Sequence, residues 1–204
     1  TLWDKAVRHC NDPRPLPREL VLEEKFLNKE GKVAHISVIN AKLFRNDNDQ
    51  ILFVADAGTA NGEELPTDEL QKMTEVLAEK DLKTAVFTTD LQSKVEWREE
   101  QGQKVIGTHS CRRFAFTSEM DGHKAEGVAW LAIDSGLPLQ VEWRFLDVPF
   151  RDEESTINGY KQTDDYVIAD GGECSLVQSE VVISLKYSLF FIPYEGELQR
   201  RTIF

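Results

Sequence analysis

The chain has 204 residues, with 24 Lys and Arg against 36 Asp and Glu, so its formal net charge is −12. This acidic balance disfavours nucleic acid and anionic membrane surfaces as partners, because both are bound through clustered basic side chains. No apolar run approaches the roughly 20 residues that a membrane-spanning helix needs, so we do not expect an integral membrane protein. The length predicts a single domain, and 41% hydrophobic residues are enough to fill its core.

Three alternating prolines, Pro13, Pro15 and Pro17, stand near the start of the chain. Proline cannot donate to a strand ladder and favours extended backbone. The sequence therefore predicts an extended N-terminal arm over residues 1–17 and a single domain over residues 18–204. Because the chain begins with Thr1, we expect a mature form from which any signal peptide has been removed.

After the arm, strand-like segments alternate with turn residues at hairpin spacing. Residues 19–28, 32–44 and 50–57 predict a three-stranded antiparallel meander. One helix is predicted over Asp68–Glu79, with a narrow apolar stripe that includes Met73. Further strands are predicted over residues 94–99, 104–108, 112–118, 126–133, 139–146, 155–162, 166–169, 176–191 and 198–204.

The segment 139–146 alternates apolar and polar residues, which predicts a strand with one dry face. A symmetric hairpin before it would pair Leu131 with Val141 and Ala129 with Trp143. A turn near Gly122 would place two phenylalanines on the same face. The predicted apolar face contains Phe114, Phe116, Leu139, Val141, Trp143 and Phe145. A face this broad must be covered, either by curling of the sheet or by a second sheet.

Two stretches resemble a known group of proteins. The segment Gly127–Leu131, followed by Asp134–Pro138, resembles a hairpin of bacterial envelope proteins that have the fold of the lipoprotein carrier LolA. The strand that contains Cys111, Phe114 and Phe116 and the closing segment 200–204 resemble theirs as well. The resemblance implies a mainly β (α+β) fold: a large curved antiparallel sheet that forms a half-barrel with one or two covering helices. It also implies export to the periplasm and an apolar concavity, which in the carrier receives acyl chains.

We therefore expect a non-catalytic periplasmic carrier for an acyl chain, a lipid or a lipoprotein. The alternative is an envelope structural or protein-interaction module whose core is filled by its own side chains. A hydrolase or isomerase in a lipocalin-like cup is a third hypothesis. The predicted ligand-binding residues are Met73, Phe114, Phe116, Val141, Trp143 and Phe145.

Sequence signals for catalysis or metal binding are weak. No nucleophile elbow, phosphate-binding loop, dinucleotide fingerprint or zinc-binding spacing is present, so we expect no cofactor and no metal. His109 and Cys111 would share a strand face, but a nucleophilic pair also needs a third, orienting group. Cys10, Cys111 and Cys174 permit one disulfide and a free thiol or three thiols, and we expect three thiols.

Overall fold

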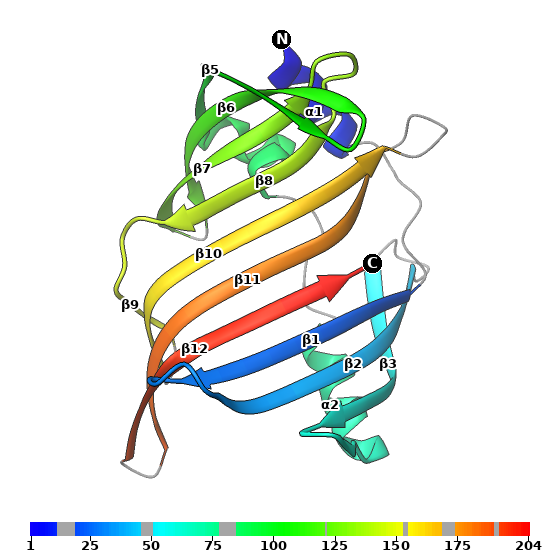
Figure 1. Cartoon of the computed structure of the whole chain (residues 1–204), viewed down its shortest axis with the longest axis vertical. Helices are drawn as coiled ribbons and strands as arrows, with labels where there is room; N and C mark the ends of the chain where they lie inside the picture. The colour runs from blue at the N-terminus through cyan, green and yellow to red at the C-terminus, as the bar shows by residue number, and fades with distance from the viewer. Residues whose placement is uncertain are drawn as a thin grey trace.

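The protein is built on one large antiparallel sheet (Figure 1). The computed structural model describes residues 1–11, 19–45, 51–77, 85–120, 122–152, 155–168, 174–189 and 192–204. The strands in these residues are β1 (Glu19–Asn28), β2 (Val33–Arg45), β3 (Ile51–Ala60), β4 (Glu63–Glu64), β5 (Glu96–Ile106), β6 (His109–Met120), β7 (His123–Ala132), β8 (Pro138–Phe145), β9 (Phe150–Asp152), β10 (Ser155–Ile168), β11 (Cys174–Leu189) and β12 (Ile192–Ile203). The helices are α1 (Leu2–Asn11) and α2 (Thr67–Leu77), with the short 3-10 helices η1 (Ala85–Phe87) and η2 (Thr89–Lys94).

The sheet is open. Its strands follow the order β4-β3-β2-β1-β12-β11-β10-β8-β7-β6-β5, and β9 pairs with β10 outside this path. Figure 1 shows α1 at one end of the molecule, beside β5 to β8, and α2 at the other end, beside β1 to β3. The predicted fold class is thereby confirmed: mainly β, with one large antiparallel sheet that does not close and few helices.

Two pairs of predicted strands are single strands in the structure. The segments 94–99 and 104–108 both belong to β5, because the residues around Gly102 form a bulge between Glu100 and Gln103. The chain turns instead at Gly107, where a φ of 59° favours glycine. The segments 155–162 and 166–169 likewise join in β10, which has a register shift between Asp165 and Tyr166.

Cross-strand pairing shows that both helices lie on the same face of the sheet. Directly paired residues share a face, and one such row runs through Gly58, Ile39, Leu22, Thr202, Ser179, Asp164, Val141, Ala129 and Phe114. At one end of this row a Cβ on Gly58 would meet Leu70 of α2 at 3.1 Å. At the other end the ring of Phe114 lies 6.2 Å from that of Trp3 in α1. We call this side the inner face and the opposite side the outer face.

The inner face carries two separate cores. The first lies between β6, β7 and β8 and the elements α1 and η1, and it includes Trp3, Phe87, Phe114, Phe116 and Val141. The second lies near α2 and contains Leu20, Leu22, Ile39, Ala41, Leu43 and Phe53. The central strands β10, β11, β12 and β1 join the two covered ends.

The predicted extended arm is wrong for residues 2–11, which form α1. Thr1 and Asp4 cap this helix reciprocally: the Asp4 amide donates to Thr1 Oγ1 at 3.1 Å, and Thr1 Oγ1 donates to Asp4 Oδ2 at 2.7 Å. Trp3 and Ala6 are 1% and 0% exposed, so the helix buries one face in the first core. The three prolines that suggested the arm lie outside the described residues.

Candidate functional site

Three of the predicted ligand-binding residues lie beneath the chain's own N-terminal helix. Phe114, Phe116 and Val141 are 1%, 3% and 0% exposed. The Trp3 ring lies 6.0 Å from that of Phe116 and 4.9 Å from that of Phe87. Trp3 therefore occupies the part of the inner face that the sequence assigned to a ligand.

Hydrogen bonds hold this cover in place. Trp3 Nε1 donates to Gln92 Oε1 at 3.0 Å. Gln92 Nε2 in turn donates to the carbonyl oxygens of Val86 at 2.8 Å and Thr88 at 3.1 Å. The buried indole thus has its polar atom satisfied, as a buried tryptophan requires.

Met73 belongs to α2, and its side chain lies outside the described residues. This helix packs against β3, next to one edge of the sheet, whereas Phe114 and Phe116 stand on β6, next to the other edge. The structure therefore does not bring the helix of Met73 together with the strands that carry the other predicted residues.

Trp143 and Phe145 are half-buried on the inner face and pack against the first core. Their ring centroids lie 5.2 Å apart, and each lies 5.0 Å from the ring of Tyr160 on β10. Aromatic contacts at such distances add to the stability of a cluster. Tyr160 was not among the predicted residues, although alternation along 155–162 would have placed it on one face with Gln162.

The apolar surface continues from this cluster across the central strands. Tyr160 pairs with Ile183, Ile183 with Leu198, and Leu198 with Phe26. All four side chains are half-buried. The set that we call the inner apolar patch consists of Trp143, Phe145, Tyr160, Ile183, Leu198 and Phe26.

A polar chain on β10 borders this patch. The Tyr160 hydroxyl donates to Gln162 Oε1 at 2.8 Å, and Gln162 Nε2 donates to Asp164 Oδ1 at 3.0 Å and Oδ2 at 3.1 Å. Asp164 is only 2% exposed. Burial raises the pKa of its carboxyl group, and hydrogen bonds from Ser179 and Gln162 oppose that rise.

One ion pair stands on the inner face of the central strands. Arg200 of β12 is paired in register with Glu24 of β1, and its guanidinium donates to the Glu24 carboxylate. The two side chains are 28% and 23% exposed, so solvent reaches both. The charges of the two side chains offset one another.

The buried carboxyl group predicts how stability depends on pH. Since the pKa of Asp164 is raised in the folded state, the folded protein binds this proton more tightly than the unfolded chain does. The free energy of unfolding of the parent, relative to Asp164→Asn, is therefore expected to fall as pH rises through the range above about 4, the ordinary pKa of an aspartate side chain. Urea unfolding of both proteins across this range measures the difference, and a difference that is independent of pH would contradict the assignment.

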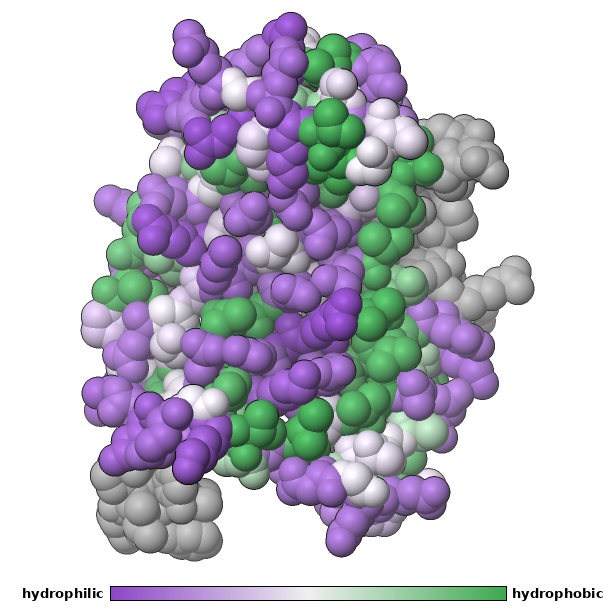
Figure 2. Space-filling view, viewed as in Figure 1, coloured by the Kyte–Doolittle hydropathy of each residue, from purple (hydrophilic) through white to green (hydrophobic). Residues whose placement is uncertain are grey.

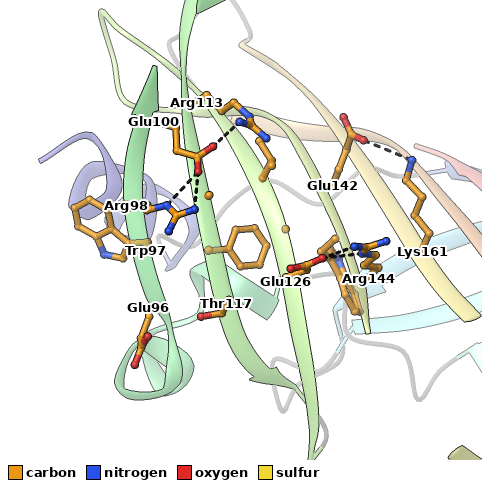
Figure 3. A pocket seen from close by; sticks show the side chains of 15 residues that line it. Glu96, Trp97, Arg98, Glu100, Arg113, Thr117, Glu126, Glu142, Arg144 and Lys161 are labelled. Atoms are coloured by element: carbon orange, nitrogen blue, oxygen red, sulfur yellow. Dashed lines mark hydrogen bonds and ion pairs between the residues drawn. The ribbon is translucent and has the colours of Figure 1, made fainter. Parts of the chain in front are cut away.

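The outer face carries a pocket of about 610 Å³ over β5 to β8 and β10 (Figure 3). Its floor is made of small side chains, because Ala115 and Val128 stand opposite one another in the middle of the pocket. Each basic side chain that lines it is ion-paired with a lining glutamate: Arg98 and Arg113 with Glu100, Arg144 with Glu126, and Lys161 with Glu142. Figure 2 shows the same hydrophilic character over most of the face turned to the viewer. An ionic ligand would have to displace existing partners here, so we place the candidate site on the inner face.

The residues weighed for catalysis do not form a nucleophilic pair. Cys111 Sγ contacts the backbone oxygen of His109 at 3.6 Å, while the imidazole of His109 faces Asp134 Oδ2 at 3.3 Å. Burial raises the pKa of the Cys111 thiol, which disfavours a reactive thiolate. Cys10 and Cys111 are not joined in a disulfide, whereas the side chain of Cys174 lies outside the described residues.

Within the described part of the chain, no group of three or more His, Cys, Asp and Glu side chains is arranged to hold a metal ion. None of its helices is long and apolar enough to cross a membrane.

Comparison with solved structures finds seven chains of similar fold. The protein is similar over 98% of its length to the crystal structure of a proposed outer membrane lipoprotein-sorting protein domain from Vibrio parahaemolyticus, 88% of which is covered. The two chains are 9% identical, and their TM-score is 0.45. No family model matches the sequence, and no curated protein matches it significantly.

Proposed function

We propose that the protein is a non-catalytic, periplasmic binding or carrier protein that holds an acyl chain, a lipid or the acyl part of a lipoprotein on its inner face. The observation that carries this proposal is the half-buried inner apolar patch on the central strands. Six aromatic and aliphatic side chains there remain partly accessible between two covered cores. Export to the periplasm rests on the motif resemblance in Gly127–Pro138.

The dimensions of the patch suit a long acyl chain. It runs across the strands from β8 through β10, β11 and β12 to β1. Four strand spacings of about 4.8 Å give it a length of roughly 19 Å. A flexible chain laid across the strands would contact the side chains of Trp143 or Phe145, Tyr160, Ile183, Leu198 and Phe26 in turn.

The envelope interaction module is the second candidate, and one observation favours it. The first core is filled by Trp3 and Phe87, so Phe114 and Phe116 are closed to a ligand in this structure. If the central patch were covered by a partner protein in the same way, no lipid would enter. The two candidates differ in whether the isolated protein takes up an apolar molecule.

A solvatochromic fatty-acid probe tests the carrier proposal. We expect the delipidated protein to bind it at about 1 μM, which corresponds to roughly 8 kcal/mol. Ile183→Asn places an amide in the inner apolar patch and should weaken binding about tenfold, since an uncompensated polar group costs about 1–3 kcal/mol. Fluorescence titration of parent and variant measures the change.

The neighbouring residue supplies a matched control. Val182 is also half-buried on β11, but it pairs with Lys161 and Gln199 on the outer face. Val182→Asn should therefore perturb the strand as much as Ile183→Asn does and leave probe affinity unchanged. Equal affinities of the two variants, or a folded parent that takes up no probe, would refute the carrier proposal and favour the interaction module.

A further inference from the structure

The inner apolar patch has a polar border on one side. Residues that are paired directly across neighbouring strands form a row on the inner face. Along each strand, the next residue on this face lies two positions further and about 6.6 Å away, and it belongs to the next row. The row that holds Tyr160 and Ile183 is apolar. The two rows beyond it contain the polar residues Gln162, Arg200, Glu24, Asp164, Ser179 and Thr202.

The accessible charged side chains in these rows are already paired, and Asp164, which is 2% exposed, lies too deep to meet a ligand. Arg200 is already engaged by Glu24. Gln162 is held between Tyr160 and Asp164, so its amide is fixed beside the patch. The same rows contain the apolar residues Val181 and Leu22 and two half-buried hydroxyl residues, Ser179 and Thr202, which are paired in strand register.

The charge balance selects among head groups. A carboxylate or phosphate would have to take Arg200 from Glu24, and an amine would have to take Glu24 from Arg200, which leaves one charge uncompensated in a half-buried place. The net charge of −12 adds a general repulsion against anions. An uncharged head group with several hydroxyl groups neither breaks the Arg200–Glu24 pair nor is repelled by the net charge. The amide and hydroxyl side chains on the inner face can form hydrogen bonds with it.

We infer that the inner face binds a single-chain amphiphile with an uncharged, hydroxyl-bearing head group, its acyl chain on the inner apolar patch and its head against Gln162, Ser179, Thr202 and the Arg200–Glu24 pair. This inference rests on the proposed function and adds to it the class of ligand. A monoacylglycerol has this chemistry.

Competition among three ligands of equal chain length tests the inference. Monododecanoylglycerol, dodecanoate and dodecylamine are each used to displace the solvatochromic probe, below the concentration at which any of them forms micelles. The uncharged glyceride is expected to bind roughly tenfold more tightly than either ion. Dodecanoate or dodecylamine binding as tightly as the glyceride would overturn the inference and leave the carrier proposal intact. Displacement by none of the three, with no uptake of the probe itself, would refute the carrier proposal.

Changing one carboxylate should reverse the preference. Glu24→Gln removes the partner of Arg200 and frees a cation on the inner face, so dodecanoate is expected to bind roughly tenfold more tightly than it binds the parent. Glu23→Gln is the matched control, because Glu23 pairs with Lys25 on the outer face of the same strand. A gain in dodecanoate affinity in both variants, or in neither, would contradict the placement of the head group beside Arg200.

A second pair of variants probes the hydrogen-bonding side chain. Gln162→Leu keeps the size of the side chain and should abolish the preference for the glyceride, whereas Thr163→Leu on the outer face of β10 should keep it. Circular dichroism confirms that each variant is folded. Retention of the full glyceride preference by a folded Gln162→Leu would overturn the role of this row.

Discussion

Trp3→Ala is expected to lower the free energy of unfolding by about 3–5 kcal/mol, the range found when a buried aromatic side chain is truncated. Trp3 is 1% exposed. Its ring stacks on that of Trp97 at 5.5 Å and lies within 6.2 Å of three phenylalanine rings. Truncation leaves a cavity above β6 and also removes the hydrogen bond to Gln92. Urea unfolding followed by far-UV circular dichroism measures the loss.

The exposed residue Arg8 on the same helix provides the control. Arg8→Ala keeps the apolar stripe of α1, and its effect should stay within about 0.5 kcal/mol, as for most surface substitutions. If Trp3→Ala unfolded at the same urea concentration as Arg8→Ala, α1 would not belong to the first core.

Signals for α1 were present in the sequence. Thr1 and Asp4 have the spacing of a capping pair, and Trp3 and Ala6 fall on one helical stripe. The prolines at positions 13, 15 and 17 dominated the prediction, although they begin only after the last residue of the helix. A Pro-rich stretch limits where a helix ends, but it does not determine what precedes it.

The face of β8 was predicted correctly even though its pairing was wrong. The structure pairs Ala129 with Val141 and Gly127 with Trp143, two residues away from the symmetric hairpin expected from the sequence. A displacement by two residues preserves the face of every side chain, since the period of a strand is two. Leu139 is the exception: it lies at the register shift between Pro138 and Gln140, and it packs with Cys111 and Ala132 in a separate cluster.

The inner apolar patch could not be assembled from the sequence. Its side chains come from five strands, and the pairing that joins Phe26 to Leu198 connects the two ends of the chain. Turn residues determine the register within a hairpin, but they carry no information about which distant strands become neighbours. The sequence identified Trp143 and Phe145 because both lie in the alternating segment 139–146. Ile183 and Leu198 lie in other segments, which no hairpin turn joins to 139–146.

Gly127→Ala is expected to destabilise the protein by about 1–3 kcal/mol, the usual cost of an added group in a packed site. Gly127 of β7 pairs with Phe116 on one side and Trp143 on the other. A Cβ at this position would lie within 3.0 Å of the Phe116 ring and of the Glu142 carbonyl oxygen, closer than real side chains approach. The ring is confined by the Trp3 cover, and the carbonyl belongs to the backbone of β8, so neither can move freely.

Gly159→Ala separates this steric effect from the general effect of replacing glycine in a strand. A Cβ on Gly159 would meet only Ser184 Oγ at 3.5 Å and Ser184 Cβ at 3.6 Å, which is ordinary van der Waals contact. The alanine also reduces the conformational freedom of the unfolded chain, so this variant should be neutral or up to about 1 kcal/mol more stable. Thermal and urea unfolding of both variants measures the contrast. Equal stabilities of Gly127→Ala and Gly159→Ala would mean that the Phe116 ring is not packed tightly against Gly127. This result would contradict the close packing of the first core beneath Trp3.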